Sequence, residues 1–137
     1  MSRALTFEVS GHLLLLPGDG RREVFERGAV VPLPGGGPLL LGLTALHGRA
    51  VPLVTVAPLL GAAPAAGTLT LLAEEAGEEL ALAVDALGGL TEGPRTEGLP
   101  FADRTDPLGE APAPGEPRPL NLPALVRLLR AGLAPAP

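Results

Sequence analysis

The fold is decided by one stretch, Gly42-Leu-Thr-Ala-Leu-His-Gly-Arg-Ala-Val-Pro-Leu-Val-Thr-Val-Ala-Pro-Leu-Leu-Gly61. It lies within a longer segment, residues 28–73, whose one formal charge is Arg49. A chain of 137 residues does not leave so much apolar surface in water unless a partner covers it. The segment therefore belongs to a core, a membrane or an interface.

Three prolines argue against a membrane-spanning helix in this segment. Residues 50–73 carry no charge and are long enough to cross a bilayer. However, Pro52, Pro58 and Pro64 recur through them, and each interior proline removes a helical hydrogen bond that lipid cannot replace. Residues 50–56, which are rich in valine and threonine, instead suit a buried β-strand.

The composition indicates a cytoplasmic protein that does not bind nucleic acid. The chain has no cysteine, which excludes disulfides and thiolate metal sites and favours an intracellular setting. Glu8 follows the N-terminus too closely for a signal peptide. The net charge is −5, the basic residues are scattered arginines, and Trp and Tyr are absent. A phosphate-binding surface needs clustered cations, and a base-stacking platform needs aromatic side chains.

Short apolar segments separated by Gly and Pro predict a β-barrel or a β-sandwich. Residues 5–9 alternate in period two, Ser10-Gly11 indicates a turn, and residues 12–16 suit a second strand, so we expect an N-terminal hairpin. Further strands are predicted at residues 68–72 and 80–84, and residues 22–27 fit either a strand or a short helical turn.

The remaining segments predict a hairpin tip, an irregular stretch and a helix. The acidic link 74–79 is typical of a solvated tip, and residues 88–115 are rich in Gly, Pro and Glu and therefore read as irregular. Asn121 can cap a helix that ends at Gly132. Its apolar positions follow helical spacing: Leu122, Leu125, Val126 and Leu129.

No group of residues supports catalysis or metal binding. The serines are Ser2 and Ser10 and the histidines are His12 and His47, whereas nucleophilic catalysis needs a hydroxyl or thiol beside an oriented base. Two isolated histidines do not make a metal site. We expect a binding protein that is not an enzyme, with no cofactor, no metal and no small-molecule substrate.

The opening stretch resembles the signature of the CheW-like family of chemotaxis coupling proteins, Gly-Val-x-Asn-Leu-Arg-Gly-x-Val-Val-Pro-Val-Val-Asp-Leu. The residues in register are Gly42, Leu43, Leu46, Gly48, Val51, Pro52, Leu53, Val54 and Val56. Upstream, Phe7 fits the family's first strand, residues 14–17 match its Tyr-Ala-Ile/Leu-Pro step, and Glu23-Val24 match its Glu-Val/Ile pair. Downstream, residues 80–85 resemble the apolar strand that ends in Val-Asp, and residues 120–122 resemble the closing Leu-Leu-Asp-Leu. It covers most of the chain and is weakest over residues 90–119.

The chain departs from the family pattern at four positions. His47 replaces the signature arginine, Ala45 its asparagine and Thr55 its aspartate, and Arg21 stands where valine usually precedes the glutamate by two residues. Histidine at neutral pH does not replace a planar, always-charged guanidinium. We hypothesise that Arg49 partly substitutes for it.

The resemblance implies a mainly β fold of two intertwined small SH3-like β-barrels with a C-terminal α-helix. It would form one CheW-like domain over residues 1–132, with a shortened second barrel, an irregular stretch at 88–119 and a tail at 133–137. By resemblance, the residues that contact protein partners are Glu23, Val24, Gly42, Leu43, Leu46, His47, Gly48, Arg49 and Val51.

The function implied is that of a non-enzymatic adaptor or scaffold, which couples chemoreceptors to a CheA-type histidine kinase in chemotaxis or pilus-based motility. Its partners would be the regulatory domain of the kinase and the signalling tip of the receptor. The alternative is a stand-alone structural β-domain that interacts with other proteins and has lost this coupling.

Overall fold

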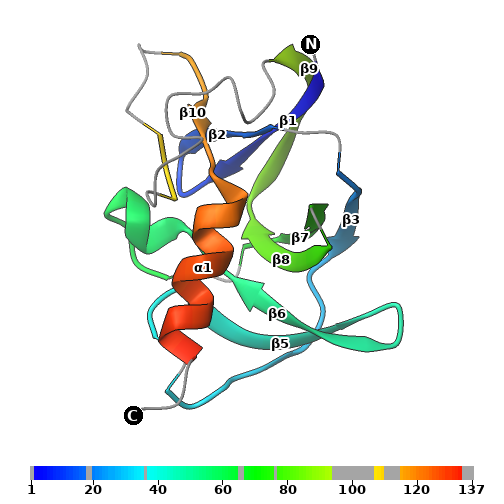
Figure 1. The fold of residues 1–137 in the computed structure, drawn as a ribbon, viewed down its shortest axis with the longest axis vertical. Coiled ribbons are helices and arrows are strands. Elements are labelled where there is room, and N and C mark those ends of the chain that lie inside the picture. Colours follow the sequence, from blue (N-terminus) through cyan, green and yellow to red (C-terminus); the bar gives the residue numbers. More distant parts are fainter. Residues whose placement is uncertain are drawn as a thin grey trace.

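The computed structural model shows two β-sheets and one C-terminal helix (Figure 1). It describes residues 2–17, 20–35, 37–64, 67–75, 77–93, 107–109 and 115–133. The four-stranded sheet has the order β10-β2-β1-β9 and consists of β1 (Ser2–Val9), β2 (His12–Pro17), β9 (Ala86–Gly93) and β10 (Arg118–Pro119).

The six-stranded sheet has the order β3-β7-β8-β6-β5-β4. Its strands are β3 (Arg22–Glu26), β4 (Val30–Val31), β5 (Leu40–Leu46), β6 (Arg49–Val54), β7 (Leu69–Glu75) and β8 (Glu78–Val84). A 3₁₀ turn, η1 (Ala57–Leu60), follows β6, and α1 (Leu122–Leu133) ends the fold. The chain enters the second sheet after β2 and returns to the first with β9. The two sheets are therefore intertwined, and the predicted fold class is confirmed.

Two hairpin turns have the same backbone geometry, one of them at the predicted turn Ser10-Gly11. Ser10 and Gly11 have φ of 51° and 81°, and His47 and Gly48 have φ of 51° and 74°. Positive φ at both central residues defines the type I′ turn, whose twist matches that of the flanking strands. The first turn joins β1 to β2, which confirms the N-terminal hairpin, and the second joins β5 to β6.

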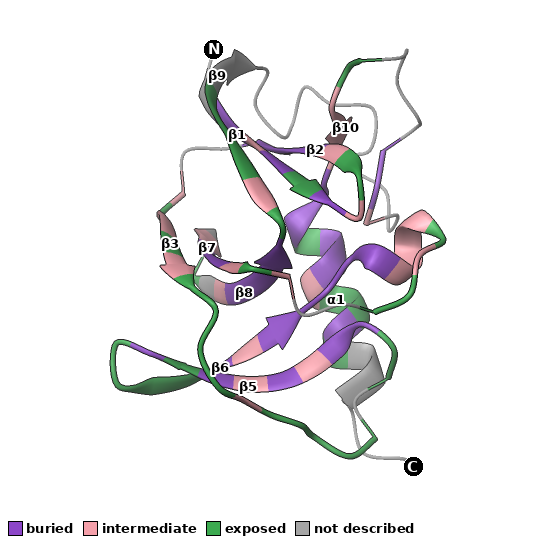
Figure 2. Ribbon diagram, turned by 180° about the vertical axis from the view of Figure 1, so that it is seen from behind, coloured by how far each residue is buried: buried purple, intermediate pink, exposed green. Residues whose placement is uncertain are grey.

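The main core lies between the two sheets and α1 (Figure 2). Fully buried members include Phe7 and Leu14 from the first sheet, Leu71 and Leu82 from the second, and Leu125 from the helix. Because side chains alternate along a strand, the neighbouring residues of the second sheet face the opposite way.

These neighbours form a second core on the other face of the six-stranded sheet. It consists of Leu46, Val51, Leu53, Leu72, Ala81 and Ala83, with Phe25, Val30 and Leu41 packed against it. β7 and β8 therefore carry apolar side chains on both faces and form a wall between the two cores.

The C-terminal helix matches its sequence signals closely. The Ala124 N–H donates to Asn121 Oδ1 at 3.3 Å, which is the predicted N-cap bond. Leu122 and Leu125 are buried, and the helix ends at Leu133, one residue beyond the predicted end. Among the described residues, no helix is long and apolar enough to cross a membrane.

β9 and β10 correct the expectation that residues 88–119 are irregular. Residues 88–93 continue β9, which pairs with β1. The register shifts between Thr6 and Phe7, and a Cβ on Gly88 would lie 2.2 Å from Thr6 Oγ1. Gly88 therefore permits a close approach between two strands. Residues 94–106 and 110–114 lie outside the described part of the chain, as does the predicted tail beyond Leu133.

Candidate protein-binding site

The β5–β6 hairpin carries the signature-like segment, and its turn lies near β3 (Figure 1). In the strand order, β7 and β8 lie between β3 and β6. Side chains of β3 nevertheless contact the hairpin turn directly. The sheet must therefore curl around the second core, so that strands far apart in the order come together.

His47 makes this contact from the first central position of the turn. Its Nε2 lies 2.8 Å from Glu23 Oε2, and its ring meets Phe25 edge to face, with centroids 5.3 Å apart and an interplanar angle of 77°. Phe25 packs against the second core. His47 therefore fastens the hairpin to β3 at the margin of that core.

Glu23 has a second cationic partner, Arg21, whose Nη2 lies 3.0 Å from the same Oε2. We call Arg21, Glu23 and His47 the clasp. The hydrogen bond with His47, followed by that with Arg21, lowers the pKa of Glu23 below its ordinary value. All three side chains are in contact with solvent, so the clasp positions the hairpin more than it stabilises the fold.

Arg49, at the start of β6, forms an ion pair with a carboxylate of β8. Its Nη2 lies 2.8 Å from Glu79 Oε2 on β8, and the Glu79 side chain is only 19% exposed. The guanidinium that touches Glu23 is thus the one on Arg21. Whether Arg49 substitutes for the signature arginine in partner binding stays a prediction.

The other residues predicted from the resemblance divide into a buried group and an exposed group. Leu46 and Val51 lie in the second core, and Leu43 is half-buried. Gly42 is buried, and a Cβ there would lie 2.2 Å from the Val31 carbonyl oxygen. These four residues shape the hairpin from within.

The exposed group consists of Val24, His47, Gly48 and Arg49. Val24 is 42% exposed on β3, which is an edge strand of its sheet. Because consecutive side chains of a strand point to opposite faces, Val24 points away from Glu23 and from the rest of the clasp. The structure therefore offers two adjoining surfaces here, one charged at the hairpin turn and one apolar on the edge strand.

Sequence reasoning missed Arg21, Phe25 and Glu79 as members of this site. Arg21 had been noted as a departure from the family pattern, which was the available signal. Glu79 had been interpreted as part of a solvated hairpin tip, but its pairing with Arg49 shields it. Thr55, which replaces the signature aspartate, is buried, and its Oγ1 accepts a hydrogen bond from the Ala57 N–H at 3.2 Å. Thr55 thus supports the start of η1.

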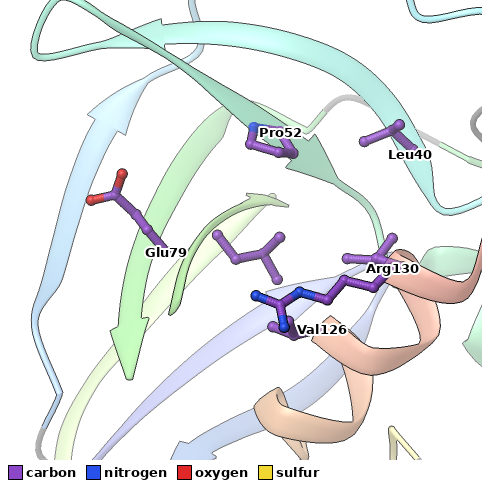
Figure 3. A pocket seen from close by; sticks show the side chains of 7 residues that line it. Leu40, Pro52, Glu79, Val126 and Arg130 are labelled. Carbon is purple, nitrogen blue, oxygen red and sulfur yellow. The ribbon is translucent and has the colours of Figure 1, made fainter. Parts of the chain in front are cut away.

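An apolar hollow of about 150 Å³ lies between β6, β8 and α1 (Figure 3). It is lined by Leu40, Pro52, Glu79, Leu80, Val126, Leu129 and Arg130. β6 and β8 pair in parallel at Leu53 and Val54, and Pro52 has no N–H with which to extend the ladder. Among the described residues, no group of three or more His, Cys, Asp or Glu could hold a metal ion.

Comparisons with known proteins agree with this architecture. Residues 3–100 match the family model described as a CheW-like domain. The fold is similar to the crystal structure of the scaffolding protein TtCheW from Thermoanaerobacter tengcongensis, with a TM-score of 0.66 and 14% sequence identity, over 88% of this chain and 84% of that one. No curated protein matches the chain. The matched residues include the hairpin, the clasp and the edge strand β3.

Proposed function

The chain belongs to the CheW-like family, and from this membership we propose that it is an adaptor that couples chemoreceptors to a CheA-type histidine kinase in chemotaxis or pilus-based motility. In this role it works in the cytoplasm by binding alone, without catalysis and without a cofactor. Its partners are the regulatory domain of the kinase and the signalling tip of the receptor.

The observation that carries the proposal is the pair of adjoining surfaces on β3 and the β5–β6 turn, both within the matched residues. An edge strand has unpaired backbone groups that a partner strand can bind, and an exposed valine adds apolar area. Val24 supplies this combination on β3, and His47 and Arg49 add polar contacts at the turn. We assign the apolar surface to the kinase regulatory domain.

The test is to titrate the purified chain against the kinase regulatory domain and the receptor signalling tip of its own organism. Val24→Asp should weaken kinase binding by about tenfold or more, because a charge would be desolvated at the interface. Val31→Asp is the matched control, because Val31 is 63% exposed on β4, the opposite edge of the same sheet. It should leave binding within about twofold.

Two results would contradict the proposal. If Val31→Asp weakens kinase binding and Val24→Asp does not, the surface has been assigned to the wrong edge. If the native chain binds neither partner, the coupling role fails. The second candidate, a structural β-domain that has lost coupling, would then be favoured. His47 at the signature-arginine position and the engagement of Arg49 by Glu79 point in that direction.

A further inference from the structure

One oxygen atom of the clasp, Glu23 Oε2, contacts two basic side chains of different chemistry. Glu23 Oε2 lies 2.8 Å from His47 Nε2 and 3.0 Å from Arg21 Nη2. A guanidinium stays charged at every physiological pH, whereas an imidazole changes its charge between about pH 5 and 8. The two cations therefore hold the carboxylate in different ways as the pH changes.

The surroundings of the clasp carry further charges from three other strands. Glu74 on β7 and Glu79 on β8 act electrostatically on Arg21, and Arg49 on β6 is paired with Glu79. Arg21, which directly precedes β3, contacts the Glu23 carboxylate, whereas the contacts of the turn with Glu23 and Phe25 on β3 are made by His47.

We propose that Arg21 is the positioning residue of the clasp, and that it keeps Glu23 Oε2 in place for His47 whether the imidazole is protonated or neutral. The β5–β6 turn then stays fixed on β3 across the neutral pH range, and the surface it presents to a partner does not change with pH. Where this concerns partner affinity, it rests on the proposed function.

A plain surface ion pair would behave differently from a positioning residue. If Arg21 only added a favourable charge, its removal would weaken binding by the same factor at every pH. If it positions the carboxylate, its removal leaves the clasp to His47 alone. The remaining bond is charge-assisted at low pH and neutral at high pH, and charge-assisted hydrogen bonds are roughly twice as strong.

The first experiment compares the affinity for the kinase regulatory domain at pH 6 and pH 8 in the full chain. The native protein should change by less than about twofold, and Arg21→Ala should bind about three- to fivefold more weakly at pH 8 than at pH 6. Arg21→Lys should restore a flat profile, because lysine also stays charged. The double variant Arg21→Ala/His47→Arg should be flat as well, since its turn again carries a permanent cation.

The matched control is Arg127→Ala, which removes an exposed arginine from α1 and leaves the clasp intact. It should show the native pH profile. If Arg21→Ala has the same pH profile as the native chain, or weakens binding equally at both pH values, the positioning role is overturned.

A second measurement does not need the partner. Amide hydrogen exchange at Arg49, which pairs with Leu46 across the hairpin, is expressed as a protection factor and reports the opening of the turn itself. In Arg21→Ala the protection should fall by about three- to fivefold between pH 6 and pH 8, and in the native chain it should stay constant. If the native chain binds no kinase but shows this difference, the proposed function fails and the role of Arg21 stands. Equal protection in both proteins would overturn the role of Arg21.

Discussion

Gly42 allows β4 to lie against β5, and its replacement tests this close approach quantitatively. Its φ is 149°, a conformation that side-chain-bearing residues rarely adopt, and a Cβ would lie 2.2 Å from the Val31 carbonyl oxygen and 2.8 Å from its carbon. Gly42→Ala therefore combines backbone strain, about 1–3 kcal/mol, with overpacking, about 1–3 kcal/mol. We expect the free energy of unfolding to fall by about 2–5 kcal/mol.

Two other glycines separate these contributions. Gly48 has a φ of 74° with no heavy atom within 4 Å of the added Cβ, so Gly48→Ala should carry only the left-handed penalty of about 1–2 kcal/mol. Gly28 has neither a positive φ nor a close neighbour, so Gly28→Ala should be neutral or stabilising by up to about 1 kcal/mol.

Urea unfolding followed by circular dichroism measures all three variants on one scale. In a chain of this size, 1 kcal/mol corresponds to a shift of about 3–6 °C in Tm, so thermal melts should rank the variants in the same order. If Gly42→Ala is no less stable than Gly48→Ala, the Val31 carbonyl does not constrain this position and the steric reasoning is wrong.

Three further predictions concern the second core, the clasp and η1. Leu53→Ala should lower the free energy of unfolding by about 2–5 kcal/mol, because Leu53 is fully buried; in the same urea assay Leu90→Ala, at a 63% exposed residue, should change it by less than about 1 kcal/mol. The pKa of Glu23 is lowered in the fold, so its contribution to stability is present above the ordinary carboxyl pKa and disappears as the pH falls through the lowered value. The stability difference between the native chain and Glu23→Gln should therefore be constant near neutral pH and vanish in acid, and a difference that grows in acid would contradict this sign. Thr55→Val should cost about 1–3 kcal/mol in a thermal melt, because the buried Ala57 N–H loses its acceptor; an unchanged Tm would show that this bond does not support η1.

The parts of the fold that follow from local chemistry could be predicted from the sequence. Ser10-Gly11 and Asn121 specify a turn and a helix start through their own backbone preferences, and both have the expected geometry. The partnership of His47 with Glu23 could not be predicted, because it depends on how far the sheet curls between β3 and β6. The same limit applies to Gly88. Glycine signals both loops and close strand contacts, and only the position of Thr6 distinguishes them.

The wall formed by β7 and β8 has a consequence for how these strands find their alignment. When one face of a strand is wet, a slip by one residue exposes its apolar set, and this penalty fixes the register. In β7 and β8 both faces are covered, so a slip by one residue exposes little apolar surface and the hydrophobic pattern alone does not fix the register. The alignment is left to the fit of Leu72 beside Ala81 and Leu71 beside Leu82, and to the tight turn at Gly77, where φ is 83°. Gly77 thus helps to set which leucine faces which core.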